Sequence, residues 1–428
     1  MLTVLALTFL VTVLAGVPIA FSLGLAAAAT LVAWGQVPLW LLAQRMFTGV
    51  DSFVFMAIPF FILAGELMTT AGILDRLVKF ADALVGHICG GLAHVAIVAE
   101  CFFSGISGSA VADAAALSAV LSPSMAKQYG PDFGNGVVAS AAMLGPIIPP
   151  SIPMVVYALA AGGVSIAGLF IAGIIPGIVL AAGMMAIAYV IARRRGFPVR
   201  ARTMTWREFL PEMWTVLPAL LMPVIILGGI LGGIFTATEA SAVGVFYALF
   251  IGFFVTKKLT LRTLPKVVVQ SALVSSAALV IVSMASLFAN ILTLIQLPQI
   301  VAAYITSLSR DPTVIMTLVA IFVLICGLFI DTLPAVIILV PVLAPVADQV
   351  GIDPLHFAMA FVLNITIGMV TPPVGAVLFI ITAVGQLNFA KLSRAIVPMV
   401  LALLVVLLMV MYIPAISLTL PRWFGFAR

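Results

Sequence analysis

Two stretches of apolar sequence carry adjacent prolines, and they are the parts of this chain best suited to bind an ion. The first is Gly145–Ile152 and the second is Gly368–Gly375. A proline has no amide proton, so each pair leaves carbonyl oxygens of a helix without their donors. Such oxygens are the ligands that hard cations prefer. Each stretch predicts a helix that is broken at membrane depth, with free carbonyl oxygens near Gly145 and Ile148 in the first.

A cluster of small and polar residues precedes each broken helix. Before the first, Cys101–Ser109 predicts the tip of a re-entrant hairpin, with hydroxyls at Ser104, Ser107 and Ser109. Before the second, Asp331 and Thr332 form the equivalent tip. Small residues in a bilayer often serve only close helix packing. Two tips in register with two breaks favour a transport site over that alternative.

Other polar residues near the breaks are candidates for binding a substrate: Ser109, Asp113, Ser151, Asn364 and Thr366. Asp113 lies one helical turn beyond Ser109, where a carboxyl group is either functional or a structural acceptor, and both interpretations stay open. Glu66 and Glu100 are weaker candidates that we expect to face polar helix contacts. No Lys or Arg stands out at membrane depth, so the sequence predicts recognition by hydroxyls, amides and the amino ends of half-helices, which suit an anion.

The composition is that of an integral membrane protein. Of the 428 residues, 64% are hydrophobic and 8% are charged, and the mean hydropathy is +1.34. With about 20 apolar residues per span, we expect ten to twelve crossings in a lipid bilayer and no soluble domain. The net charge of +5 comes from basic residues in loops, which indicates membrane topology rather than binding of nucleic acid. Three cysteines, three histidines and the lack of a nucleotide-binding loop predict that the chain is not an enzyme.

Adding 223 to a residue number superimposes the motifs of the first half on those of the second. The shift carries Ser109 onto Thr332, Gly145 onto Gly368 and the two prolines after Ile148 onto the second pair. Basic clusters at Arg193–Arg207 and Lys257–Lys266 are both expected on the cytoplasmic side. An odd number of crossings then separates the halves. The predicted fold is therefore an all-α integral membrane protein of inverted structural repeats, with two re-entrant hairpins and two broken helices.

This plan divides the chain into five regions. We expect the N-terminal scaffold and arm helices at 1–87, and further scaffold spans with a second arm at 166–300. The transport units, each a hairpin followed by a broken helix, are expected at 88–165 and 301–388. A C-terminal span is expected at 389–428. Within the transport units, the broken helices are predicted at about Asn135–Gly162 and Phe357–Gly385, and the last span at Ile396–Ile413.

Five segments together resemble the large membrane subunit of tripartite ATP-independent periplasmic transporters: Gly16–Ala20, Pro59–Gly65, Phe103–Asp113, Gly145–Pro150 and Thr371–Gly375. The resemblance covers essentially the whole chain. It implies a protein of the bacterial inner membrane that imports a small carboxylate, such as a C4-dicarboxylate or sialic acid, by an elevator mechanism coupled to Na⁺. It also implies two partners, which are a small membrane subunit of four spans and a periplasmic substrate-binding protein.

Carried onto this sequence, the resemblance implies two groups of sodium ligands, several of them backbone carbonyls. Around the first break they are Ser104, Ser107, Gly145, Ile148 and Pro150. Around the second they are Gly327, Asp331, Thr332, Gly368, Thr371 and Pro373. Two alternatives remain, a stand-alone divalent-anion/sodium symporter and a channel. Such symporters usually carry Ser-Asn-Thr at the hairpin tips, whereas these tips read Ser107-Gly108-Ser109 and Ile330-Asp331-Thr332.

Replacing Pro149 and Pro150 together with alanine tests the function of the first break. The change restores two amide donors and lifts a penalty of about 3 kcal/mol per helix-interior proline, so the variant should be at least as stable as the parent. A continuous helix would nevertheless withdraw the Gly145 and Ile148 carbonyls into helical hydrogen bonds. Sodium-driven uptake in liposomes should therefore collapse at unchanged expression. Normal transport by the variant would reduce the break to a packing kink.

Overall fold

The computed structural model describes residues 1–197, 199 and 206–427 as a bundle of helices, and no strand occurs among them. Seven of the helices in this described part are long and apolar enough to cross a membrane, and seven further apolar helices are shorter. Most buried apolar side chains join one continuous core. The all-helical membrane fold expected from the composition is confirmed.

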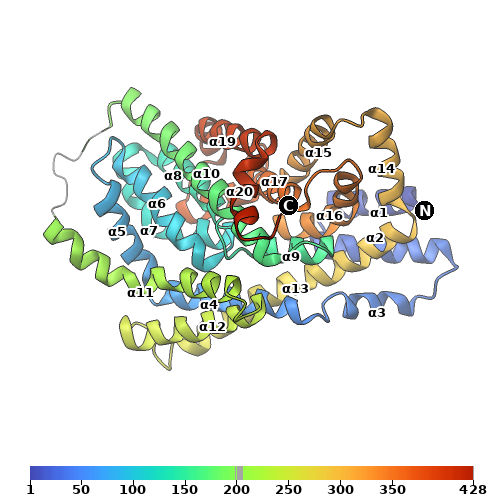
Figure 1. Cartoon of the computed structure of the whole chain (residues 1–428), viewed down its shortest axis with the longest axis horizontal. Helices are drawn as coiled ribbons and strands as arrows, with labels where there is room; N and C mark the ends of the chain where they lie inside the picture. The colour runs from blue at the N-terminus through green and yellow to red at the C-terminus, as the bar shows by residue number, and fades with distance from the viewer. Residues whose placement is uncertain (198, 200–205, 428) are drawn as a thin grey trace.

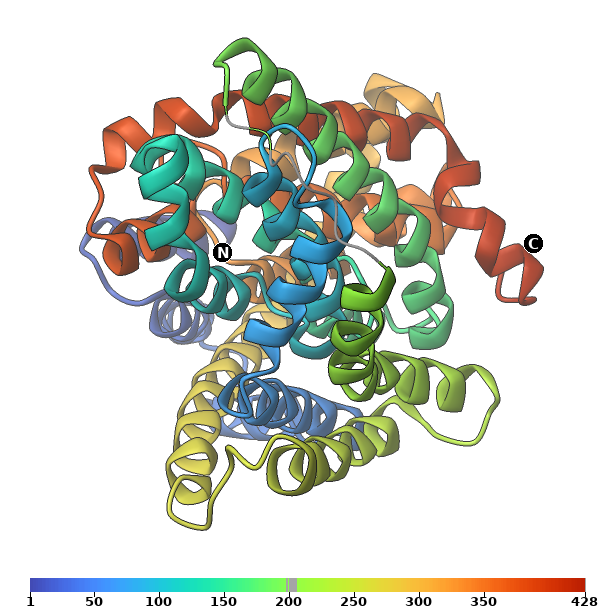
Figure 2. The same cartoon turned by 90° about the vertical axis from the view of Figure 1, so that its left-hand side faces the viewer.

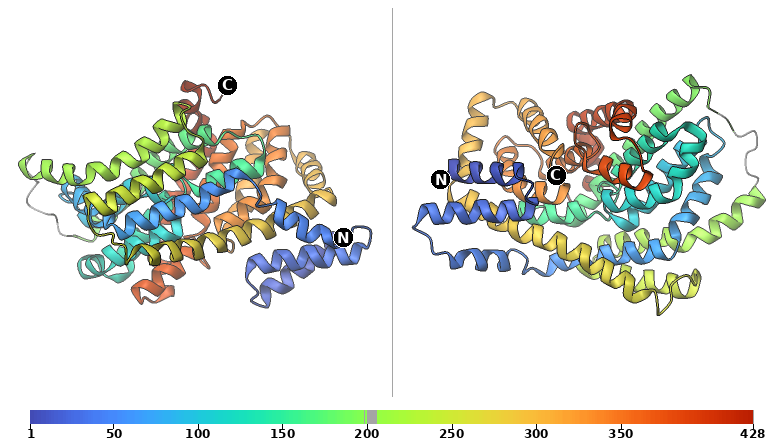
Figure 3. Two further views of the ribbon diagram at one scale, coloured as in Figure 1. Left: turned by 90° about the horizontal axis from the view of Figure 1, so that it is seen from below. Right: turned by 180° about the vertical axis from the view of Figure 1, so that it is seen from behind.

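A layer of long helices forms one face of the molecule. It contains α4 (Ala57–Thr70), α11 (Trp206–Leu231), α12 (Ala237–Phe250) and α13 (Leu264–Leu294), which lie side by side (Figure 3, left). In Figures 1 and 2 this layer lies along the lower edge, below the hairpins. The hydroxyl of Thr238 donates to the carbonyl of Phe53 over 3.3 Å and so ties the start of α12 to the 3₁₀ turn Phe53–Met56 that precedes α4.

Further helices extend this layer at both ends. α1 (Leu2–Leu14) packs on α2 (Ile19–Trp34), and both α2 and α3 (Trp40–Thr48) pack against α13. Two amphipathic helices, α5 (Ile73–Val85) and α14 (Leu297–Leu308), each connect the layer to the hairpin that follows in sequence. The separation of α1 from α2 agrees with the glycine and proline between them, which prevent one continuous helix.

The first hairpin and broken helix follow from local sequence signals. α6 (Gly91–Ser107) ends where Gly108 adopts the left-handed conformation, with φ at +63°. Ser109 then caps α7 (Ala110–Tyr129), which returns alongside α6. The next helix begins at a proline, as α8 (Pro131–Ala141), tightens into a short 3₁₀ turn, and resumes after the break as α9 (Ile152–Ala161).

The second hairpin and broken helix have the same order of elements. α15 (Pro312–Gly327) and α16 (Thr332–Gln349) form the hairpin, and Asp331 caps α16. α17 (Pro354–Gly368) and α18 (Ala376–Gly385) are the two halves of the broken helix. Like α8, α17 begins with proline, a residue that fits the first helical position because its amide is not needed there.

α10 (Ile166–Arg194) follows the first unit and α19 (Phe389–Tyr412) follows the second, and the two helices pack together. At the end of α10 the Arg195 guanidinium lies 5.3 Å from the centre of the Phe133 ring, which places this basic end beside the start of α8. Of the predicted basic cluster, Arg200 and Arg202 lie outside the described residues.

Two boundary predictions are wrong. The first hairpin tip is only a two-residue turn, because Phe103–Ser107 is still helical despite its small residues. The broken helices begin at Pro131 and Pro354, a few residues before the predicted starts, since proline opens a helix rather than ending one there. In the C-terminal region, α19 covers the predicted last span, and Pro414 then opens a short further helix, α20 (Pro414–Trp423).

The second hairpin crosses its broken helix in direct backbone contact. A Cβ atom placed on Gly368 would lie 2.6 Å from Gly327 Cα, and one on Gly327 would lie 2.9 Å from the carbonyl oxygen of Ile365. Because both partners in this contact are backbone atoms, no side chain can rotate to make room.

Replacing Gly368 with alanine should therefore destabilise the protein by about 1–3 kcal/mol, the usual cost of overpacking a core. Thermal unfolding of the purified protein measures the change. Gly228→Ala is the matched control, because a Cβ there meets no atom within 4 Å and alanine is the better helix former. An equal melting temperature for Gly368→Ala and the parent would contradict the crossing.

Candidate ion and substrate site

The tip of the first hairpin is held against the first break by backbone contacts. The amide of Ile152 donates to the carbonyl of Gly108 over 3.4 Å. A Cβ atom on Gly108 would lie 2.7 Å from the carbonyl oxygen of Pro150, so only glycine fits at this approach. The two parts that the sequence predicted to form one site are thus in contact.

The break leaves backbone oxygens free, as the prolines require. The amide of Ile148 donates back to Leu144 over 2.8 Å, and the Pro149–Pro150 bond that follows is cis. Within the described part of the chain, no donor reaches the carbonyl oxygens of Gly145, Ile148 or Pro150. These oxygens are able to coordinate a cation.

Ser151 ties the two sides of the break together. Its hydroxyl donates to the carbonyl of Pro146 over 2.6 Å and accepts from the amide of Met154 over 3.3 Å. The side chain therefore caps α9 while it closes the loop, and it is fully buried.

Asp113 lies between the first hairpin and the break. The hydroxyl of Ser107 donates to its Oδ1, and a Cβ atom on Gly145 would clash with its Oδ2. The carboxyl group is completely buried, and Glu100 of α6, also completely buried, faces it. Ser104 points elsewhere, because its hydroxyl donates to the carbonyl of Cys101 over 3.1 Å.

The second tip makes the same kind of backbone contact and adds a side-chain contact to a thioether. The amide of Gly375 donates to the carbonyl of Leu328 over 3.3 Å, and the hydroxyl of Thr332 donates to the sulfur of Met369 over 2.8 Å. Asp331 accepts from the amide of Thr332 over 2.6 Å. The structure thus brings Asp331 and Thr332 to the second broken helix.

Within that second break, two of the predicted ligands already have partners. The amide of Thr371 donates to the carbonyl of Gly368 over 3.0 Å, and the Thr371 hydroxyl donates to the carbonyl of Ile367 over 2.8 Å. Pro373 is exposed, and its bond to Pro372 is cis. A carbonyl oxygen has a second lone pair, so these contacts leave coordination possible.

A cavity of about 450 Å³ separates the two hairpin tips from the layer of long helices. Of the predicted site residues, Ser107, Ser109, Asp331 and Thr332 line it. Asp113, Ser151, Asn364 and Thr366 do not. The amide group of Asn364 instead donates to the carbonyl of Ala320 over 2.7 Å, and the hydroxyl of Thr366 donates within its own helix to Val362 over 2.7 Å.

Three helix amino ends converge on this cavity. The first residues of α7, α9 and α16 all line it, and they include Ala110, Val111, Ile152, Pro153 and Leu333. The amino end of a helix carries a partial positive charge and unpaired amide donors. Among the described residues no Lys, Arg or His lines the cavity, so these ends are the positive groups that it offers to a ligand. Free amide donors remain at the starts of α7 and α16, whereas at α9 the amides of Ile152 and Met154 already donate to Gly108 and Ser151.

The opposite wall contains residues that the sequence analysis missed or ranked low. Glu66 and Thr69 reach the cavity from α4, and Ala277, Ala278 and other apolar residues reach it from α13. Glu66 shares a helical face with Ile62 and Thr69, but only the tertiary arrangement shows that this face meets the hairpin tips. The sequence marked Glu66 only as a weaker candidate, as an ionisable residue in an apolar helix, and gave no signal for the position of Thr69.

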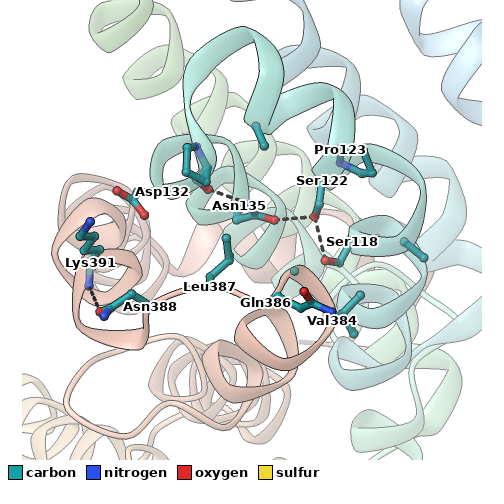
Figure 4. Close-up of a pocket in the computed structure, with 14 residues that line it drawn as sticks. Ser118, Ser122, Pro123, Asp132, Asn135, Val384, Gln386, Leu387, Asn388 and Lys391 are labelled. Carbon is teal, nitrogen blue, oxygen red and sulfur yellow. Dashed lines mark hydrogen bonds between the residues drawn. The ribbon is translucent and has the colours of Figure 1, made fainter.

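A second cavity, of about 500 Å³, lies between α7, α8 and the start of α19 (Figure 4). Its floor is a buried chain of hydrogen bonds: the Ser118 and Ser122 hydroxyls are 2.8 Å apart, Ser122 donates to Asn135 Oδ1, and Asn135 Nδ2 donates to the carbonyl of Pro131 over 2.7 Å. This chain is satisfied internally, so Asn135 packs the start of the first broken helix against α7.

The described residues contain no group of three or more His, Cys, Asp or Glu side chains that could hold a metal ion. Coordination of a cation at the tips would therefore depend on hydroxyl and carbonyl oxygens with at most one carboxylate. Sodium accepts such ligands, whereas transition metals prefer nitrogen and sulfur donors.

The family model described as "Tripartite ATP-independent periplasmic transporter, DctM component" matches residues 6–416. The chain belongs to this family. Over 405 residues it is 42% identical to the C4-dicarboxylate TRAP transporter large permease protein DctM of Pseudomonas aeruginosa, with 94% of each chain covered. Over 411 residues it is 40% identical to the sialic acid TRAP transporter large permease protein SiaM of Vibrio cholerae, with 96% of each chain covered. The resemblance noted in the sequence is thereby confirmed.

A solved structure supports the fold of this large permease. The YdaH transporter of Alcanivorax borkumensis aligns with a TM-score of 0.63 over 90% of this chain and 87% of that one. At 15% identity this likeness concerns the fold alone. The described chain is therefore a multi-pass membrane transport component with the architecture of a known membrane transporter.

Replacing Ser151 with alanine should lower the stability of this large permease by about 1–2 kcal/mol, because it removes a helix cap and a hydrogen bond across the break. Thermal unfolding provides the measurement. Ser140→Ala is the control, since that equally buried hydroxyl donates only within its own helix, to Gly136 over 2.9 Å. Equal effects of the two changes would mean that Ser151 does not join the two sides of the break.

Proposed function

We propose that this protein is the large membrane subunit of a sodium-coupled transporter that imports an organic acid. The observation that carries the proposal is the cavity between the hairpin tips, on which the amino ends of α7, α9 and α16 converge without any basic side chain. Helix amino ends bind carboxylate groups well in a site of low polarity. Such a site binds an anion without a Lys or Arg side chain. A fixed positive charge at that place would bind the anion too tightly for it to be released.

Sodium is the coupling ion that fits the residues beside the cavity. The first proposed site uses the hydroxyl of Ser107 and the backbone carbonyls of Ser104, Gly145, Ile148 and Pro150. The second uses Gly327, Asp331, Thr332, Gly368, Thr371 and Pro373. The free carbonyl oxygens of the first break support the first site, and the Asp331 carboxylate supports the second. A cation at either place lies next to the anion cavity and would strengthen anion binding.

The transport movement proposed here is an elevator motion of two inverted repeats. The regions 88–165 and 301–388 would form the moving unit, and 1–87, 166–300 and 389–428 would form its support. The equal order of elements in the two hairpin units, with starts at Pro131 and Pro354, supports the repeat. The cavity lies at the boundary between the proposed moving unit and α4 and α13, where a sliding unit would pick up its ligand.

Membership of the tripartite family supports two partners and a location. We infer a small membrane subunit of four spans, a periplasmic substrate-binding protein and residence in the bacterial inner membrane. The names of the relatives give C4-dicarboxylates and sialic acid as the cargo of those proteins, and both are organic acids. Carboxylate cargo agrees with a cavity that presents helix amino ends.

Uptake in liposomes that contain this chain and both partners should require a sodium gradient. Asp331→Ala should reduce the apparent sodium affinity by at least about tenfold, which corresponds to one charge-assisted ligand, while the variant still elutes as a folded protein. Radiolabelled uptake at several sodium concentrations measures this change. Equal uptake with potassium alone would refute the ion assignment, and an unchanged sodium dependence in Asp331→Ala would remove Asp331 from the site.

A further inference from the structure

Glu66 is an acidic residue that lines the proposed anion cavity. It lies on α4, opposite the hairpin tips, and its carboxyl group has no hydrogen-bond or ion-pair partner among the described residues. Thr69 follows one helical turn later on the same wall, and its hydroxyl donates to the carbonyl of Gly65 over 2.9 Å. Since the proton of Thr69 is used in its own helix, both residues offer acceptor oxygens to the cavity.

The two walls of the cavity thus have opposite hydrogen-bonding character. On the hairpin side, the starts of α7 and α16 present amide donors, and α9 adds the partial positive charge of its amino end. The Asp331 carboxylate also lines this side, where the sodium ion proposed above would neutralise its charge. On the α4 side, Glu66 and Thr69 present acceptors, and α13 adds only apolar residues, among them Ala277 and Ala278. A ligand that fills this space meets donors at one end and acceptors at the other.

A second negative charge on the ligand fits this arrangement poorly. A carboxylate placed beside Glu66 would repel it across a wall of low polarity, and no Lys, Arg or His of the cavity lining would compensate. A hydroxyl group placed there would instead donate to Glu66. A hydrogen bond to a charged partner is roughly twice as strong as one between neutral groups.

We propose, on the basis of the anion site proposed above, that Glu66 is a specificity-determining residue. The cavity takes an acid with one carboxylate and hydroxyl groups at its other end, and Glu66 rejects acids that carry a second carboxylate. The carboxylate of the ligand lies at the helix amino ends, and its hydroxyls lie at α4. The hydroxyls of Ser109 and Thr332 on the hairpin side, which both donate and accept, serve the middle of such a chain.

Three six-carbon acids test the proposal on the purified full chain in sodium buffer: gluconate with hydroxyls, adipate with a second carboxylate, and hexanoate with neither. Ligand-dependent shifts of thermal unfolding give the dissociation constants. Gluconate should bind at least about tenfold more tightly than adipate or hexanoate. Equal or tighter binding of adipate would overturn the proposal while leaving the anion site intact. If no acid shifts the transition, the anion site itself is wrong.

Two variants assign the selectivity to this wall. Glu66→Gln, which keeps the shape of the side chain, should reduce the ratio of gluconate to adipate affinity by about tenfold, in part because adipate binds better. Thr69→Val should weaken gluconate about threefold and leave adipate unchanged. Glu212→Gln, the same change outside the cavity lining, is the control and should alter neither. An unchanged ratio in folded Glu66→Gln would show that Glu66 does not select the ligand.

Discussion

The rest of the structure depends on the unpaired backbone of the two broken helices. In a bilayer, carbonyl and amide groups without partners are costly unless protein covers them or they line a cavity. The two proline pairs create such groups, and each hairpin tip covers them: Gly108 meets Pro150 and Ile152, and Leu328 meets Gly375. Protein must enclose that backbone without filling the cavity beside it. The two hairpins, their close glycine contacts and the helix caps at Ser109 and Asp331 meet this requirement.

Much of this arrangement could be predicted from the sequence. Proline pairs act locally, since a missing amide breaks a helix in any surroundings, and a capping residue after a glycine turn is equally local. The order of hairpin, broken helix and long span was therefore predictable in both halves. The errors are local as well. Phe103–Ser107 continues the helix because glycine and serine lower helix propensity without ending a helix, and the left-handed Gly108 ends it instead.

The cavity was only half predictable. Its hairpin wall consists of residues that the proline breaks and helix caps identify, whereas its opposite wall depends on which faces of α4 and α13 the hairpins meet. Glu66 is ordinary in sequence and becomes notable only because of where α4 lies. Conversely, Asn364 and Thr366 had the right chemistry and position along the chain, but α17 turns them toward α15 and toward its own backbone.

The contact between Thr332 and Met369 gives the second tip a property that the first tip lacks. The Thr332 hydroxyl has a definite orientation toward the sulfur, yet a thioether is a poor acceptor. An oxygen ligand or a cation that arrives at the tip has little to displace, because the bond it replaces contributes little. The Thr332 hydroxyl is thus held in one orientation by a bond that is easily replaced. The Met369 side chain that accepts this bond is flexible, so it is able to move away from the hydroxyl and return to it.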